Sequence, residues 1–188
     1  MVPTERYTKV AVALHWAIAA FILANLSLGI VMEGFKPDTA RIAAVRLHES
    51  FGLSVFVLTL VRIAWRLTHK PPPFDPHTPA WEKLAAHVTH GFLYFLMLAM
   101  PIMGWLIISS NWRRPMIIYW TLELPPFGPV QQLMPGPDKT ALHDTFVQLH
   151  VAGALILFLL LLLHVAAALK HQFWEKQPEF RRMWIGKN

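Results

Sequence analysis

The stretch LHVAGALILFLLLLLHVAAALKH, residues Leu149–His171, is an apolar run with His150 and His164 at its two ends. Crossing the roughly 30 Å of a bilayer's hydrocarbon core takes about 20 apolar residues in a helix. A lone span must be helical because hydrocarbon offers the backbone no hydrogen-bond partners. A histidine inside the hydrocarbon is costly unless something binds it. The stretch therefore predicts a transmembrane helix with two side chains that need buried partners.

The composition extends this prediction to the whole chain. Hydrophobic residues make up 55% of the 188 residues, which is more than a soluble core of this size needs. Four stretches approach the length of a membrane span, and they are residues 10–32, 47–67, 88–110 and 149–169. The first is longer than the apolar part of a signal peptide, so we interpret it as a retained span. We predict an all-α fold, an integral membrane four-helix bundle forming one domain over residues 1–188.

The charges predict the orientation of the bundle. Placing the N-terminus in the cytoplasm leaves eleven of the 17 Lys and Arg residues inside and six outside. This asymmetry follows the positive-inside rule and predicts that both termini are cytoplasmic, with the protein in an inner membrane. Anionic membrane lipid accounts for the net charge of +6, so no nucleic-acid partner is needed. The absence of cysteine excludes disulfides, thiolate-bound iron–sulfur clusters and covalently attached haem.

The histidine spacing predicts two ligand sites at different depths. His150 and His164 are fourteen residues apart, which is four turns at the 3.5-residue period of a left-handed bundle, so both face one interior seam. At 1.5 Å per residue they lie about 21 Å apart along the helix. His15 lies as deep from the cytoplasmic side as His164, and His48 opens its span on the outer side, as His150 does. We therefore expect His15 opposite His164 and His48 opposite His150.

Two imidazoles at each level favour a flat macrocycle such as haem over a bare metal. Zinc takes three or four close nitrogen or sulfur ligands, whereas each level offers two. Gly29 is fourteen residues beyond His15, level with the outer pair, and has no side chain to obstruct a macrocycle. Gly52, Gly104 and Gly153 offer similar clearance, although small residues also serve ordinary close packing of membrane helices. For any one histidine, the alternative is a simple hydrogen bond to a neighbouring carbonyl or serine.

Arg62 is a further candidate for binding the cofactor. It follows His48 by fourteen residues, so it should face the interior at the level of His15 and His164. A buried arginine in a membrane needs a negative partner, and a haem propionate is one. The alternative is that the side chain reaches the cytoplasmic interface, which is the favoured interpretation for Arg66.

The remaining histidines fit the two levels less well. His143 and His171 continue the same seam but lie beside Asp144 and Lys170, in polar surroundings. His87 and His90 begin the third span with no counterpart at their depth, and an interfacial position is favoured over a quinone or proton role. The loop histidines are His69 and His77.

Several segments resemble the bacterial cytochrome b561 family over essentially the whole chain. They are RYTKVAVALHW (6–16), VRIAWR (61–66), LHVAAALKHQFW (163–174), RRM (181–183) and the LxLPPF stretch Leu122–Phe127. The resemblance implies a four-helix inner-membrane protein with two b-type haems whose ligands fall on His15, His48, His150 and His164. The chain departs from the simplest pattern at His143, which offers a second ligand near the outer haem.

Such a cytochrome would be an oxidoreductase that transfers electrons without binding what it oxidises, because two imidazoles fill both axial positions of each iron. The resemblance implies electron transfer with ubiquinone and, in some members, oxidation of superoxide at the outer face. Arg113 and Arg114 in the outer loop would attract that anion, or would anchor the loop to lipid. Two alternatives are a membrane cytochrome subunit of a larger respiratory complex and a haem-free membrane scaffold or transporter.

Overall fold

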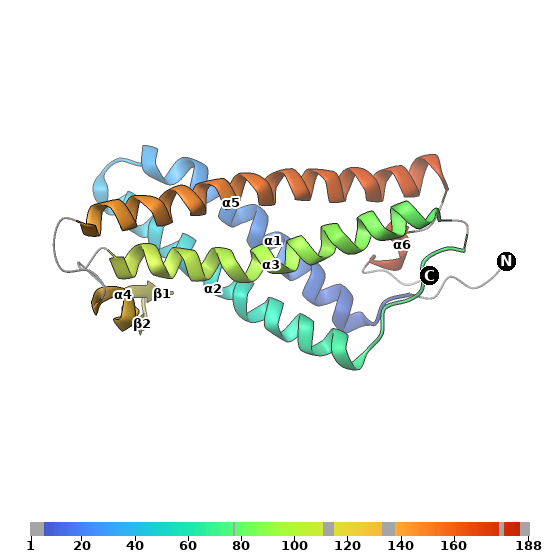
Figure 1. Ribbon diagram of the computed structural model, residues 1–188, viewed down its shortest axis with the longest axis horizontal. Coiled ribbons are helices and arrows are strands. Elements are labelled where there is room, and N and C mark those ends of the chain that lie inside the picture. The colour runs from blue at the N-terminus through green and yellow to red at the C-terminus, as the bar shows by residue number, and fades with distance from the viewer. Residues whose placement is uncertain (1–5, 77, 111–114, 133–137, 177–178, 185–188) are drawn as a thin grey trace.

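The computed structural model describes residues 6–76, 78–110, 115–132, 138–176 and 179–184. Among them, four helices are long and apolar enough to cross a membrane: Lys9–Gly34, Asp38–Thr68, Ala80–Ser110 and Thr140–Trp174. They run side by side along the long axis of the molecule (Figure 1), and the first and last residues described, Arg6 and Trp184, meet at one end of it. The predicted four-helix membrane bundle is confirmed. We call the end with Arg6 and Trp184 the inner end, and the opposite end the outer end.

The first two helices form an antiparallel pair. Helix α1 covers Lys9–Val31, a 3₁₀ turn covers Met32–Gly34, and α2 covers Asp38–Thr68. The side-chain oxygen of Thr8 accepts a hydrogen bond from the backbone N–H of Ala11 at 3.2 Å, which satisfies one of the free donors at the start of α1. Helix α2 begins nine residues before the predicted span, since a helix continues into the polar residues that flank its apolar part.

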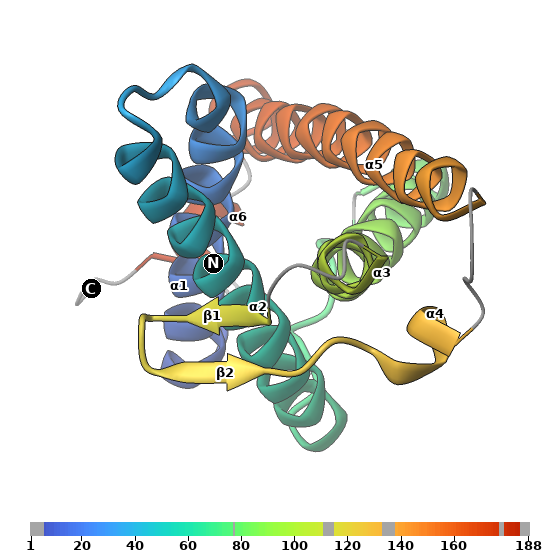
Figure 2. The same ribbon diagram turned by 90° about the vertical axis from the view of Figure 1, so that its left-hand side faces the viewer.

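The other two long helices form a second pair. Helix α3 covers Ala80–Ser110, and α5 covers Asp138–Leu169 and continues as a π-helical turn over Lys170–Trp174. Helix α3 packs along α5 and α1 packs along α2, while α2 joins the two pairs through α3. Viewed from the outer end, α1 and α2 lie on one side of the bundle and α3 and α5 on the other (Figure 2).

The outer loop contains a small hairpin that the sequence did not predict. Strands β1 (Met116–Ile118) and β2 (Leu122–Leu124) pair antiparallel, with Ile117 opposite Glu123. The turn between them places Tyr119 and Trp120 at positive φ. The short helix α4 (Gly128–Gln132) follows, and at the inner end α6 covers Glu179–Arg182. The residues that the structure describes in this proline-rich loop form no continuous helix.

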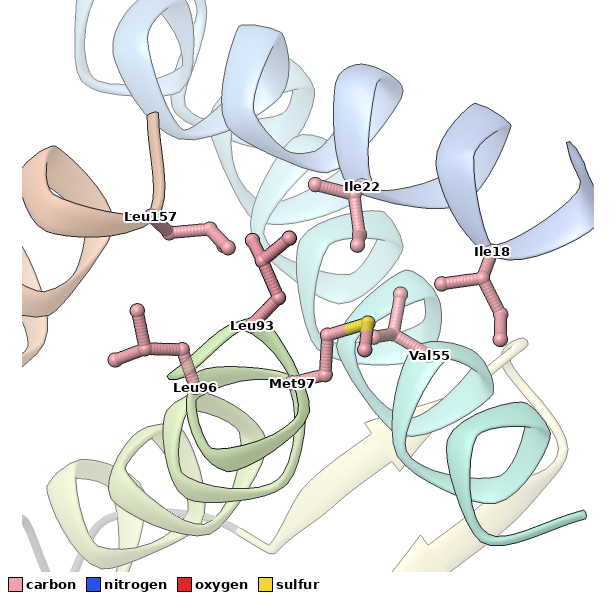
Figure 3. Packing of buried hydrophobic residues seen from close by; sticks show 7 residues of the cluster. All are labelled: Ile18, Ile22, Val55, Leu93, Leu96, Met97 and Leu157. Atoms are coloured by element: carbon pink, nitrogen blue, oxygen red, sulfur yellow. The ribbon is translucent and has the colours of Figure 1, made fainter. Parts of the chain in front are cut away.

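The core lies at mid-height between the four long helices. Its buried side chains point toward one another from α1, α2, α3 and α5 (Figure 3), and they are Ile18, Ile22, Val55, Leu93, Leu96, Met97 and Leu157. Many large apolar side chains face outward instead, such as Leu23, which is 61% exposed. An apolar exterior around a small packed interior is what a lipid environment requires, because the hydrocarbon itself solvates these side chains.

Candidate functional site

The interior contains two pairs of opposed imidazole rings. His15 of α1 faces His164 of α5, with ring centroids 6.1 Å apart and ring planes at 65°. His48 of α2 faces His150 of α5 with the same separation and the same angle. The structure therefore brings together the two pairs that matching depth predicted.

The spacing within each pair fits one metal atom held between two rings. A metal–imidazole bond is about 2.0–2.1 Å long, and a ring centre lies roughly 1.1 Å behind its nitrogen, so two axial rings should have centroids about 6.3 Å apart. Each ring of the outer pair lies against the backbone of a neighbouring helix, His48 beside Asn25 and His150 beside Met100. A ring held in this way through one nitrogen would leave its other nitrogen for a metal.

Helix packing leaves room for that group. Among the described residues, α1 packs directly on α2, and α3 packs directly on α5. Helix α5 makes no comparable contact with α1 or α2. Yet His164 and His150 of α5 reach toward the ligands on these two helices. The axes of directly packed helices lie only about 8–10 Å apart, which leaves no room for a macrocycle between two imidazoles. Helices that hold a macrocycle between their imidazoles must therefore stand further apart, as α5 does from α1 and α2. The residues present fit a haem at each level.

A spacing of fourteen residues recurs on all four long helices. At the outer level the helices contribute Gly29, His48, Gly104 and His150, and at the inner level His15, Arg62, His90 and His164. Midway between, seven residues from each level, stand the buried residues Ile22, Val55, Met97 and Leu157. The interior is therefore three layers deep, with an apolar layer between two layers that carry imidazoles.

Glycines line the outer level closely. A Cβ atom added at Gly29 would lie 3.3 Å from Cε1 of His48, and one added at Gly104 would lie 3.7 Å from Cε1 of His150. The predicted position of Gly29 at the outer level is thus matched by direct contact with the outer pair. A larger side chain at Gly29 would push the His48 ring.

The inner level contains a third imidazole. His90 of α3 lies with its ring centroid 5.4 Å from that of His164. The expectation that His90 has no counterpart at its depth was wrong. That expectation assumed that the helix begins with the apolar run at residue 88. Helix α3 begins at Ala80, so His90 is already ten residues into the helix. The signal that could have found it is the fourteen-residue spacing from His90 to Gly104.

Arg62 belongs to a basic cavity at the inner level. Its Nε donates a hydrogen bond to the hydroxyl oxygen of Tyr94 at 3.0 Å, and the side chain is partly buried. The cavity, of about 50 Å³, is also lined by Arg6, Arg66 and Lys70. Arg66 is exposed, in keeping with an interfacial side chain. Four cationic side chains around one small cavity favour an anionic ligand group such as a carboxylate.

The other histidines have protein partners. Nδ1 of His143 lies 3.0 Å from the Ser110 hydroxyl, and Nδ1 of His87 lies 2.6 Å from the backbone carbonyl of Lys83. His69 stacks on Trp65, and His171 lies 2.6 Å from Glu175. The structure does not bring any of these four into a pair at the two levels. His77, Arg113 and Arg114 lie outside the described residues.

The hairpin packs against α2 at the outer end of the bundle (Figure 2). The backbone N–H of Tyr119 donates to the hydroxyl of Ser50 at 2.8 Å, and the Tyr119 hydroxyl lies 2.7 Å from that of Ser54. Trp105 of α3 donates from Nε1 to the carbonyl of Pro125 at 3.0 Å. The Leu122–Phe127 stretch is thus attached to α3, as the hairpin is to α2.

The C-terminal segment covers the inner end beside His15. Trp16 donates from Nε1 to the carbonyl of Met183 at 2.7 Å, and its ring packs against Phe180 and Trp184. Arg182 donates to the carbonyl of Pro73 at 2.7 Å, which joins the segment to the connection between α2 and α3. The segment is therefore held in place next to the inner pair by contacts with α1 and with the α2–α3 connection.

Fold and site together define a class of protein: a membrane helical bundle whose interior is arranged for cofactors held between imidazoles. Residues 6–186 match the sequence model of prokaryotic cytochrome b561, and the chain belongs to that family. It is therefore a b-type cytochrome of the bacterial inner membrane, a multi-pass protein of electron transport that binds b-type haem.

Individual relatives match over nearly their whole lengths. Cytochrome b561 homolog 2 of Escherichia coli K12 is 29% identical, over 98% of this chain and 93% of the relative. The probable superoxide oxidase CybB of Yersinia pestis is 27% identical, over 95% and 96%. Cytochrome b562 of Cereibacter sphaeroides is 32% identical, over 94% of each chain.

Proposed function

We propose that this chain is a dihaem cytochrome that carries electrons across the membrane from a donor at the outer face to ubiquinone. In this proposal His15 and His164 ligate the inner haem, and His48 and His150 the outer haem. The observation that carries the proposal is the equal geometry of the two pairs, each with centroids 6.1 Å apart. Two sites about 21 Å apart along α5 would span most of the hydrocarbon thickness.

A bound b-type haem would supply one-electron redox chemistry at each level. The protein's own residues would set the conditions for it. The opposed histidines of each pair would hold the haem and would leave oxygen and substrate no place at its iron. The Arg62 guanidinium would neutralise a propionate in the basic cavity. The apolar layer around Leu157 keeps water and ions out of the space between the two levels.

Superoxide is the sharper proposal for the donor. The name of the Yersinia relative, probable superoxide oxidase, supports it. The overall reaction balances as two superoxide anions plus one ubiquinone plus two protons, giving two dioxygen molecules and one ubiquinol. Each superoxide loses one electron at the outer face, and the quinone gains both electrons.

Counting haems in single variants tests the ligand assignment. We expect two haem b per chain in the parent protein by pyridine haemochrome, and one in His15→Ala, His48→Ala, His150→Ala and His164→Ala. The matched control is His143→Ala, in which the partner of Ser110 is lost and both haems should stay. Loss of haem in His143→Ala with retention in His150→Ala would move the outer ligand to His143.

Stopped-flow absorbance tests the donor. Mixing oxidised protein with superoxide should reduce the haems faster than the spontaneous disproportionation of superoxide, and added ubiquinone should then reoxidise them. Haem reduction no faster than in free haem at the same concentration would exclude superoxide as the donor. Electron transfer between the haems and quinone would then be tested separately, by measuring whether ubiquinol reduces the haems.

A further inference from the structure

A second cluster of potential metal ligands lies at the inner end of the bundle, separate from the paired imidazoles. Glu82 of α3 and His171 and Glu175 at the end of α5 each offer a ligand atom, and these atoms all lie within 4.8 Å of one another. His171 follows His164 by seven residues, about 10 Å along the helix. The cluster therefore belongs to neither imidazole pair.

The π-helical turn assembles the part of the cluster that α5 contributes. The backbone N–H of Glu175 donates to the carbonyl of Lys170 at 3.2 Å, a bond that spans five residues. This wider turn places both Lys170 and His171 beside the Glu175 carboxylate, at 2.7 Å from Nζ and 2.6 Å from Nδ1. π-Turns inside α-helices occur frequently at functional sites.

Glu82 supplies the second, independent observation. Its side chain is only 8% exposed, and its Oε1 accepts a hydrogen bond from Nζ of Lys170 at 2.8 Å. Its other oxygen, Oε2, is buried without a hydrogen-bond partner and points toward Nε2 of His171 at 3.8 Å. A buried carboxylate oxygen left unpaired is costly, and a cation between Glu82 and His171 would remove that cost.

We propose that Glu82, His171 and Glu175 form a binding site for a zinc-like divalent cation that links α3 to α5 at the inner membrane surface. Two carboxylates and one imidazole, with water in the fourth position, match the ligand types and number that zinc takes at an accessible site. Oxygen and nitrogen ligands lie about 2.0–2.2 Å from zinc, so the three side chains need to close in by little more than an ångström.

Lys170 holds the place of the cation in the structure. Its ammonium bridges Glu82 and Glu175, yet the side chain is 46% exposed and can turn into water when a metal binds. Hydrogen bonds from Lys170 and then His171 lower the pKa of Glu175 below its usual value, so Glu175 is an ionised ligand at neutral pH. Lys170 therefore competes with the metal, and removing its charge should strengthen metal binding.

The test is zinc binding by the full-length, haem-loaded protein in detergent, measured by competition with a fluorescent zinc chelator. We expect one Zn²⁺ per chain, at least tenfold weaker binding in His171→Ala and in Glu82→Gln, and at least tenfold tighter binding in Lys170→Met. The matched control is His87→Ala, another histidine at the inner end, whose Nδ1 is already bonded to the backbone of Lys83. It should bind zinc as the parent does.

Unchanged haem content and visible spectrum in each variant show that the bundle is intact. If the Glu82→Gln variant loses haem, the Glu175→Gln variant is used in its place. Absence of saturable zinc binding in both the parent and Lys170→Met would overturn the proposal. Zinc binding that His171→Ala leaves unchanged would do the same.

Discussion

The outer and inner levels of the bundle use one backbone arrangement and differ in the side chains placed on it. Each has an imidazole pair with centroids 6.1 Å apart, and each receives one residue from all four long helices at the same fourteen-residue spacing. Beside its pair, the outer level has two glycines, Gly29 and Gly104. Beside the inner pair, the other two residues of that level are Arg62 and His90. The two levels thus have the same imidazole geometry, but the outer level has more free space beside its pair and the inner level has a positive charge.

The unequal charge gives the two levels different redox properties under the proposed function. A cation near a haem favours its reduced form, and an anion favours its oxidised form. Arg62 stands at the inner level, while the buried Glu49 follows the outer ligand His48 directly in the sequence. We therefore expect the inner haem to have the higher potential. Electrons entering from the outer face would then move downhill toward the inner side.

The largest expected effect comes from filling the space at the outer level. In Gly29→Leu the new side chain would start 3.3 Å from the His48 ring and occupy the position beside the outer pair. We expect loss of the outer haem with retention of the inner one, so haem per chain should halve in the pyridine haemochrome assay.

The control for this prediction is Gly34→Leu, near the same end of the bundle, where an added Cβ meets nothing within 4 Å. It should keep both haems. Full haem content in Gly29→Leu would show that Gly29 serves close helix packing and makes no room for a macrocycle.

The next largest effect should come from removing the charge of the inner level. A unit charge about 9 Å away at an effective dielectric constant of about 20 contributes roughly 2 kcal/mol, or about 80 mV. Arg62→Met should therefore lower the potential of the inner haem by roughly this amount and leave the outer haem nearly unchanged, as measured by spectroelectrochemical titration. Arg66→Met, at an exposed position of the same cavity, should give a smaller shift. Equal shifts at both levels would remove the electrostatic distinction between them.

The sequence alone was sufficient to predict which imidazoles meet, because a helix converts residue spacing into depth by fixed geometry. His15 and His164 could be paired by counting residues from the ends of their apolar runs. The same count failed for His90, because hydropathy marks the edge of the lipid and not the end of the helix. Helix α3 extends eight residues beyond the apolar run that begins at residue 88.

The outer hairpin was not predictable for a different reason. Its strands are three residues long and have no strong alternation of their own. Hydrogen bonds to Ser50 and Ser54 of α2, more than sixty residues earlier in the chain, attach its turn to the bundle. Local sequence patterns contain no information about such distant partners. The cluster of Glu82, His171 and Glu175 was not predictable either, because it depends on a π-turn and on a residue from another helix.

A smaller effect should separate the third inner imidazole from the two ligands. His90→Phe keeps an aromatic ring against His164 but removes the polar nitrogens, so both haems should be retained. The inner potential should shift by less than in Arg62→Met, since a neutral imidazole exerts a weaker field than a guanidinium. Haem counting and the same redox titration measure this. Loss of one haem would instead make His90 a ligand, and the inner level would then differ from the outer in coordination as well as charge.

The smallest effect concerns the contribution of the inner end to acid stability. Because Lys170 and His171 lower the pKa of Glu175 from its ordinary 4.5, ionised Glu175 stabilises the folded state fully above about pH 4.5. That contribution is lost as the pH falls through the lower pKa of the folded protein. Glu175→Gln removes it at every pH, so its thermal midpoint should lie below the parent's at pH 7 and approach the parent's once the pH is below that lowered pKa. Since Glu175 is at the exposed end of the network, the difference should be small and should shrink in high salt. A gap between the two proteins that widens on acidification would contradict this sign and would mean that Glu175 contributes in its protonated form.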